Sequence, residues 1–241
     1  MNVQQPSPLE ESLQRFKSIL TAAEQKQILA LQDQPLAAGI RLNPLKVTPY
    51  EKMLDLESRY GWQVDPVPFC EPCWAIQVAE TSPGGTIDHR MGQYYLQDVA
   101  SMIPVSLFDF QSLPSQPLIL DMAASPGGKT THLIGRSMDG GFVVANDASQ
   151  GRIPALRSVL AAWGGINQII TQFPGESFGA WYPATFDLVL LDAPCSMENL
   201  RPTPSHPLRE TTTSERHRLG DRQFQLLTSA GPAAMAVMRV T

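Results

Sequence analysis

The sequence is short of cysteine and of long hydrophobic runs, and each shortage narrows the class of protein. Three cysteines in 241 residues are too few for a disulfide scaffold and suit a reducing, cytoplasmic environment. No run of about 18 apolar residues occurs, so we predict no membrane span. The beginning of the chain, MNVQQPSPLEES, lacks a basic region followed by an apolar stretch, which argues against a secretion signal.

A net basic charge is also missing. The formal charge is −5, so bulk charge does not indicate nucleic-acid binding. A hydrophobic fraction of 43% nevertheless provides for a substantial core, and the length suits one large domain or a domain with an appendage. Basic side chains concentrate in the polar segment 199–222, which carries Arg201, Arg209, Arg216, Arg218 and Arg222.

Residues 1–90 predict a small N-terminal α+β domain. Three capping boxes, in which Ser or Thr precedes Glu by three residues, start predicted helices over 7–20, 21–31 and 48–60. Gly61 ends the last of them, as glycine often does at helix C-termini. We also expect a strand over 74–78 and, within a linking region at 91–117, a helix over 97–108.

Strands and helices alternate from Leu118 onward, which predicts an α/β fold with a parallel, Rossmann-like sheet in domain 118–241. Apolar runs predict strands over 118–121, 142–146, 167–171 and 187–191. Helices are expected over 129–138 and 151–163, closed by Gly140 and Gly164. We expect this sheet to be incomplete at its C-terminal end, with strand 187–191 as an exposed edge unless 233–240 covers it.

A small-residue turn between the first of these strands and its helix is the main candidate for ligand binding. The stretch LILDMAASPGGKTT places an apolar strand, a glycine turn and a helix start in succession, so backbone N–H groups point toward a ligand. Asp147 follows Gly127 by 20 residues, at the end of the next strand. This is about the separation at which a nucleotide-binding βαβ unit places a carboxylate on ribose hydroxyls, so we predict a nucleoside-containing cofactor.

Two cofactors compete for this turn. Gly128-Lys129-Thr130 could end a phosphate-binding loop, and strand 188–192 could then hold magnesium. That loop requires glycine at position 123, which is Ala123, and Pro126 removes a backbone donor. S-adenosylmethionine in a Rossmann-like methyltransferase accounts for Ala123, Pro126 and Asp147 together, and we prefer it. The remaining alternative is a turn that binds no ligand.

The stretch Asp192-Ala193-Pro194-Cys195-Ser196 follows another strand of the same sheet. Ligands bind at the carboxyl ends of parallel strands, so Cys195 is expected to face the same crevice as the glycine turn. Methylation of a pyrimidine at C5 requires a thiolate that adds at C6 and an acid near N3, and Cys195 with Asp192 could supply these groups. The alternative role of Cys195 is that of a small buried apolar residue.

Cys70-Glu71-Pro72-Cys73 is a lone C-x-x-C motif. No second cysteine pair exists, and His89 lies too far along the chain for a familiar zinc spacing, so we predict no metal. We expect the other histidines, His132, His206 and His217, to be surface or packing residues.

Three motifs together carry a resemblance to a known family. DMAASPGGKTT, then ANDAS with Arg152, then LLDAPCS resemble the Sun-type RNA (cytosine-C5) methyltransferases, which include bacterial 16S ribosomal RNA enzymes. The segments RLNPLK at 41–46 and YYLQD at 94–98, with Ala100-Ser101-Met102, are similar to the N-terminal and linking motifs of that family. The resemblance covers roughly residues 35–230.

The resemblance implies methyl transfer from S-adenosylmethionine to cytosine C5 in RNA, most readily ribosomal RNA. Apart from the resemblance, we expect a monomer that binds no metal. The cofactor would be held by Asp147 at its ribose, by Asp192 and Arg152, and by the turn Ala123, Ala124, Ser125, Pro126, Gly127, Gly128 and Lys129. Asp192 would also lie beside the target base, and Cys195 would assist product release. RNA would contact Arg41, Lys46 and Arg201.

The sequence departs from the family pattern at three places. Pro174 stands where the family usually has an acid near the adenine, and Met197 and Asn199 replace two glycines. No cysteine follows Cys195, so the family's attacking cysteine has no counterpart, and we expect the chain as it stands not to turn over. A catalytically inactive RNA-binding protein, a P-loop nucleotidase and a DNA methyltransferase that uses Cys195 as nucleophile are the alternatives.

Overall fold

The computed structural model describes residues 10, 13, 14, 16–31, 38–195, 212–234 and 237–240. The chain divides into two compact units, Met1–Leu36 with Cys195–Leu219 and Ala37–Pro194 with Gly220–Thr241. In the first unit, helix α2 (Ala22–Ala30) begins with the predicted capping box, in which the side chains of Thr21 and Glu24 each accept a hydrogen bond from the other's backbone N–H. Six of the fourteen residues of the predicted helix 7–20 lie outside the described residues, as do Met197, Asn199, Arg201 and His206.

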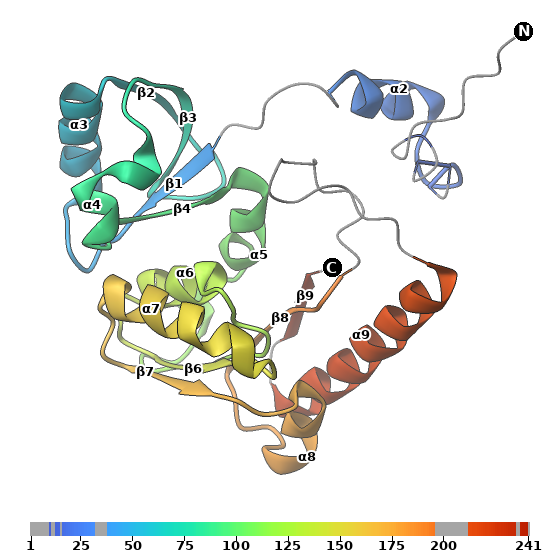
Figure 1. Ribbon diagram of the computed structural model, residues 1–241. Helices are drawn as coiled ribbons and strands as arrows, with labels where there is room; N and C mark the ends of the chain where they lie inside the picture. Colours follow the sequence, from blue (N-terminus) through green and yellow to red (C-terminus); the bar gives the residue numbers. More distant parts are fainter. Residues whose placement is uncertain are drawn as a thin grey trace, which may run out of the picture. The chain divides into compact units, whose positions relative to one another are not determined.

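The second unit begins with an antiparallel sheet in the order β2-β3-β1-β4. Its strands are β1 (Ala38–Leu42), β2 (Trp62–Pro66), β3 (Cys73–Ala79) and β4 (Tyr94–Asp98). Helix α3 (Pro49–Tyr60) lies beside this sheet (Figure 1) and contributes Met53 and Leu56 to its buried core. The predicted bounds of α3 are confirmed, and Gly61 ends it in the left-handed conformation at φ 63°.

The linking region differs from its prediction. The first part of the expected helix 97–108 belongs to β4, because Gln97 and Asp98 pair with β1. Only short helical turns follow, a 3₁₀ turn over Val99–Met102 and α5 (Ile103–Ser106). The N-terminal sheet therefore extends to Asp98, beyond the boundary expected near residue 90.

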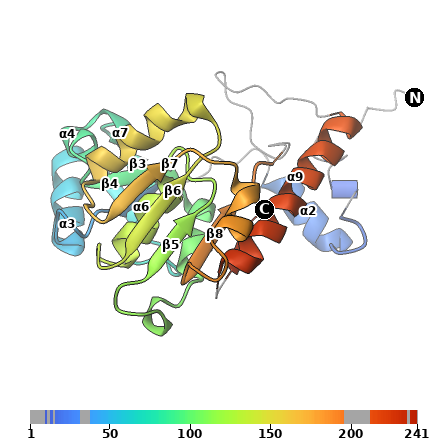
Figure 2. The same ribbon diagram turned by 90° about the horizontal axis from the view of Figure 1, so that it is seen from below.

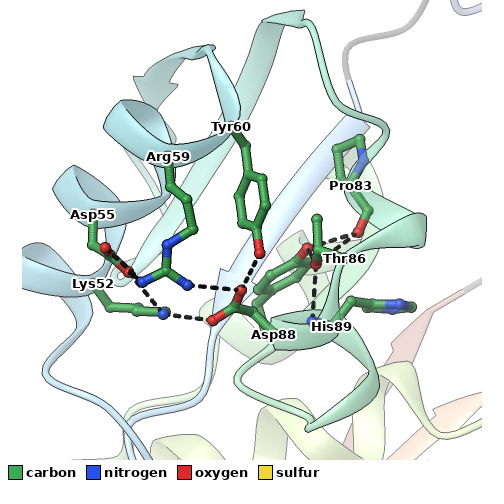
Figure 3. A network of polar contacts seen from close by, with 9 residues as sticks. Lys52, Asp55, Arg59, Tyr60, Pro83, Thr86, Asp88 and His89 are labelled. Atoms are coloured by element: carbon green, nitrogen blue, oxygen red, sulfur yellow. Dashed lines mark hydrogen bonds and ion pairs between the residues drawn. The ribbon is translucent and has the colours of Figure 1, made fainter.

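A buried carboxylate ties α3 to helix α4 (Ile87–Arg90) in the N-terminal region (Figure 3). Asp88 is 3% exposed and accepts hydrogen bonds from Lys52 Nζ at 2.6 Å and from the Tyr60 hydroxyl at 2.5 Å. Burial alone would raise the pKa of Asp88. The hydrogen bonds from Lys52 and Tyr60, together with the positive charges of Lys52 and Arg59, instead hold this pKa below its ordinary value. Arg59 approaches the same carboxylate at 3.4 Å, so the buried charge is compensated.

The second sheet is parallel and has the order β7-β6-β5-β8-β9. Figure 2 shows β7, β6, β5 and β8 side by side in that order. The strands are β5 (Leu118–Asp121), β6 (Phe142–Asn146), β7 (Gln168–Thr171), β8 (Leu188–Asp192) and β9 (Val237–Val240). From β5 the chain moves outward through β6 and β7 and then crosses to β8, so the direction of winding reverses between β5 and β8. Ligands of open α/β sheets bind at such a reversal, beyond the carboxyl ends of the strands.

Helices cover both faces of this sheet and bury two separate apolar cores. Alternate residues of β5 point to opposite faces, with Ile119 packed beside α6 (Gly128–Arg136) and α7 (Ile153–Trp163). Leu120 packs in the other core, with residues of α8 (Phe178–Trp181) and α9 (Thr213–Ala233). No helix of the described residues is both long enough and apolar enough to cross a membrane.

The condition for a covered strand β8 is met, whereas the expected end of α6 at Gly140 is wrong. Strand β8 is not an exposed edge, because β9 pairs with it in parallel from Val189 opposite Val237 to Asp192 opposite Val240. Gly140 does not close α6, since Ser137 is its C-cap and the two residues after Ser137 take positive φ values. Gly164 does close α7, at φ 86°.

Candidate functional site

The glycine turn after β5 is shaped by a residue that must lack a side chain. Gly127 caps α6 at φ 116°, a conformation that residues with a Cβ rarely adopt. A Cβ on Gly127 would also lie 2.8 Å from Val159 Cγ1 of α7. Backbone geometry and packing therefore both require glycine, and together they hold the N-terminus of α6 at the end of β5.

Asp147 reaches this turn from the end of β6, as its separation in the sequence predicted. Its side chain lies against the turn, where Oδ2 accepts a hydrogen bond from the Ser125 N–H at 3.2 Å. Its Oδ1 accepts one from the Ser149 N–H at 2.9 Å. Asp147 is 3% exposed, so these backbone donors fix the carboxylate beside the turn.

Arg152 braces the same turn from the segment that precedes α7. Its Nη1 lies 3.5 Å from Asp147 Oδ2, and its Nη2 donates to the Ser125 carbonyl. The Ser125 hydroxyl in turn donates to the Arg152 carbonyl at 3.3 Å. The structure thus brings Ser125, Asp147 and Arg152 together at the carboxyl ends of neighbouring strands.

Asp192, at the end of β8, faces the turn from the other side of β5. Its Oδ2 accepts a hydrogen bond from Lys129 Nζ at 2.7 Å. The loop beyond it is held by α9, where Gln223 Nε2 donates to the Pro194 carbonyl at 2.7 Å. Cys195 follows Pro194 directly in the chain and has an exposed, free thiol.

Asp121 and Asn146 are polar residues of the site that the sequence analysis did not single out. Asp121 is 1% exposed, and burial raises its pKa to about 6, although the Thr130 hydroxyl donates to its Oδ2 at 2.6 Å. Its Oδ1 has no hydrogen-bond partner among the described residues. Asn146 donates to the Met122 and Phe173 carbonyls at 3.1 and 3.0 Å, which ties the ends of three strands together. Both residues end buried apolar strands, and that position was the signal available in the sequence.

Arg41 does not have the role that the sequence analysis expected. It is 2% exposed, and its Nη2 donates to the Gly128 carbonyl at 2.9 Å and to Thr131 Oγ1 at 2.6 Å. Its guanidinium also lies over the Trp163 ring, 4.7 Å from the centroid, and burial lowers its pKa to about 9. The predicted RNA contact of Arg41 is therefore replaced by a buried contact with α6.

Lys46 is exposed but already engaged. Its Nζ donates to the Met91 carbonyl at 2.7 Å and to the Ala162 carbonyl at 2.6 Å, at the C-terminal end of α7. An RNA contact from Lys46 remains a prediction.

Two aromatic side chains, Phe173 in the loop after β7 and Trp181 at the end of α8, lie near Pro174, where the family usually has an acid. Phe173 precedes Pro174, and its ring meets Trp181 edge to face at 5.7 Å. Both rings are about half exposed, at 45% and 51%. A separate surface hollow, lined by Glu176, Phe224 and Thr228 among others, lies between α8 and α9 and includes none of the predicted site residues.

A parallel sheet with this strand order, a glycine turn after its central strand and carboxylates after the two neighbouring strands defines a Rossmann-like methyltransferase domain. Solved structures of that class share the fold. The methyltransferase homologue protein from Pyrococcus horikoshii matches with a TM-score of 0.74 and 24% identity, over 95% of this chain and 74% of that one. NSun6 from Pyrococcus horikoshii with SFG matches with a TM-score of 0.77 and 17% identity, over 95% and 80% of the two chains.

The sequence matches family models over nearly the whole described chain. The model of the 16S rRNA methyltransferase RsmB/F matches residues 112–234, and the N-terminal domain of the 16S rRNA methyltransferase RsmF matches residues 10–99. The chain belongs to the RsmB/F family of 16S rRNA methyltransferases, as the motifs predicted.

Curated relatives are named ribosomal RNA small subunit methyltransferase F. The protein of Pectobacterium atrosepticum is 38% identical over 195 residues, which cover 79% of this chain and 40% of that protein. The protein of Vibrio campbellii is 34% identical over 224 residues, which cover 92% of this chain and 46% of that protein. The chain thus spans less than half the length of these relatives.

Proposed function

We propose that this chain binds S-adenosylmethionine at the glycine turn and serves methyl transfer to cytosine C5 of ribosomal RNA. Family membership supports the reaction class, and one contact carries the assignment of the cofactor site. The Asp147 carboxylate accepts the Ser125 N–H at the turn, beside the point where the winding of the sheet reverses. A carboxylate at that position suits the ribose hydroxyls of a nucleoside cofactor.

The charges around the turn suit S-adenosylmethionine better than a nucleoside triphosphate. Three carboxylates lie at the ends of adjacent strands: Asp121 and Asp192 are the last residues of β5 and β8, and Asp147 directly follows β6. The cation of the turn, Lys129, is paired with Asp192, whereas a P-loop lysine must be available to phosphates. The sulfonium and ammonium groups of S-adenosylmethionine are cationic, so the buried, unpartnered Oδ1 of Asp121 offers the cofactor a favourable acceptor.

In this reaction the residues of the chain would bind the cofactor, bind the target base and assist product release. The turn 123–129 and Asp147 would hold the cofactor, which supplies an electrophilic methyl group when bound. Asp192 would hold the target cytosine and share a proton at N3, because a base made more electron-poor accepts a nucleophile at C6 more readily. By family resemblance Cys195 would assist release of the methylated product.

Calorimetry with S-adenosylmethionine and with MgATP tests the cofactor, and Asp147→Asn is the diagnostic variant. We expect Asp147→Asn to weaken cofactor binding at least tenfold, because charge-assisted hydrogen bonds are worth about 1.5–3 kcal/mol each. Asp65→Asn, a change at an exposed residue of β2, is the matched control. Tighter binding of MgATP, or unchanged affinity in Asp147→Asn, would remove the turn or Asp147 from the assignment.

Incubation with unmodified ribosomal RNA and labelled S-adenosylmethionine tests the reaction. The proposal places the label on cytosine C5, identified after digestion of the RNA to nucleosides. The assay compares the chain alone with a form extended by a family-type C-terminal segment. Label from the chain alone that disappears in Cys195→Ala would make Cys195 the nucleophile. Cofactor binding without label in either form would leave an RNA-binding protein.

A further inference from the structure

The fold completes a cluster of metal ligands that the sequence analysis left incomplete. Cys70 and Cys73 flank the turn that enters β3, with Cα atoms 5.5 Å apart. His132 comes from α6, and its Nε2 lies 3.6 Å from Cys70 Sγ. The three possible ligand atoms lie within 4.8 Å of one another. The residues are 1%, 2% and 2% exposed, so the cluster is buried between the N-terminal sheet and α6.

The distance between sulfur and nitrogen agrees with a zinc coordination sphere. Tetrahedral zinc binds thiolate at about 2.3 Å and imidazole at about 2.05 Å, which places the two ligand atoms roughly 3.6 Å apart. The observed separation of Cys70 Sγ and His132 Nε2 is 3.6 Å. A ligand set of two Cys and one His also suits zinc better than it suits harder cations, which prefer oxygen ligands.

Two polar side chains near the cluster, His132 and Arg41, have incomplete partners among the described residues. The two sulfurs are joined as a disulfide in this structure. The buried imidazole of His132 has Cys70 Sγ as the partner of its Nε2, and its Nδ1 has no hydrogen-bond partner among the described residues. Arg41 pairs directly with Cys73 across β1 and β3, and its guanidinium bonds Thr131, the neighbour of His132. The described ion pairs include no carboxylate partner for Arg41.

We propose that reduced Cys70 and Cys73, with Nε2 of His132, bind one zinc ion. Each thiol releases its proton to solvent as its bond to zinc forms, and a small ligand such as water takes the fourth tetrahedral position. The bound ion would fasten β3 to the helix whose N-terminus forms the glycine turn. The site stands independently of the cofactor assignment, since no ligand atom of the cluster belongs to the turn.

Metal content measured on the full chain tests this proposal. The protein is purified with a phosphine reductant, offered Zn²⁺, freed of loosely bound metal and analysed by mass spectrometry of the elements. We expect one zinc per chain in the wild type and in the control Cys195→Ser, and a loss of at least tenfold in zinc affinity in Cys73→Ala and in His132→Gln. Retention of full zinc affinity in both cluster variants would overturn the assignment of the ligands.

A second measurement uses only the wild type, in case the variants fail to fold. Co²⁺ in place of zinc should give thiolate-to-cobalt charge transfer and the intense visible bands of a tetrahedral site. Zinc should also protect two of the three thiols from a thiol-reactive dye, and a chelator should expose them. A reduced, folded chain whose three thiols react equally with and without zinc would overturn the proposal. A pair that forms a disulfide and binds no metal after reduction would do so as well.

Discussion

Replacing Asp121 by Asn should make the free protein more stable at neutral pH. Burial raises the pKa of Asp121 from 3.8 to about 6, so the ionised carboxylate is less favourable in the folded chain than in the unfolded chain. A shift of about two units corresponds to roughly 3 kcal/mol. Asn keeps the shape and an acceptor for Thr130 but removes the buried charge. We therefore expect Asp121→Asn to raise the free energy of unfolding at pH 7.5 by about 1–3 kcal/mol.

The pH dependence of the unfolding free energy provides a second test of this prediction. Between pH 3.8 and about 6 the folded chain binds more protons at Asp121 than the unfolded chain, so the wild type loses stability as the pH rises through this window. Asp121→Asn lacks that loss, and its advantage should shrink toward pH 4. Urea unfolding at several pH values, with Asp65→Asn as control, measures the difference. A variant less stable than the wild type at pH 7.5 would show that the Thr130 hydrogen bond outweighs burial and would refute the reasoning.

Asp121→Asn should also weaken S-adenosylmethionine binding several-fold, because it removes a carboxylate from the place proposed for the cationic groups of the cofactor. Unchanged affinity in calorimetry would exclude Asp121 from that place. Gly127→Ala should lower the unfolding free energy by more than about 1 kcal/mol, since its φ of 116° and the contact with Val159 both oppose a Cβ; a thermal melt equal to that of the wild type would contradict this. Arg41→Lys should destabilise the chain by about 1–3 kcal/mol in urea, because an ammonium cannot reproduce the bonds to Gly128 and Thr131 together with the stacking; an unchanged midpoint would mean that these contacts contribute little. RNA binding should show a shallow salt dependence, on the order of two to four released counterions, and gel shifts in which duplex DNA competes equally would argue against RNA specificity.

The second sheet could be predicted closely because its signals are local. Strands 118–121 and 142–146 were predicted with their observed bounds, since each is an apolar run that ends at a polar residue. The contact between Asp147 and the glycine turn also followed from spacing alone. It requires only that two consecutive parallel strands lie side by side, which βαβ connections enforce.

The errors arose where contacts join distant segments. The last two residues of β4, Gln97 and Asp98, were expected to be helical, but pairing with β1, which lies far upstream in the sequence, overrides the local preference. The side chain of Arg41 meets α6 across 87 residues, and Cys70 meets His132 across 62. Neither pairing has a spacing that a single sequence reveals, so neither the burial of Arg41 nor the proximity of His132 to the C-x-x-C motif could be predicted.

The basic motif RLNPLK at 41–46 makes contacts of this kind with helices α6 and α7. Asn43 Nδ2 donates to the Trp163 carbonyl at 2.7 Å, and Lys46 Nζ donates to the Ala162 carbonyl at 2.6 Å. These carbonyls belong to the last turn of α7, where backbone acceptors lack partners within the helix and cations are favoured by the helix dipole. Arg41 bonds the Gly128 carbonyl at the start of α6. One short segment therefore holds both helices that flank the glycine turn, so the N-terminal sheet and this turn are coupled through the side chains of Arg41, Asn43 and Lys46.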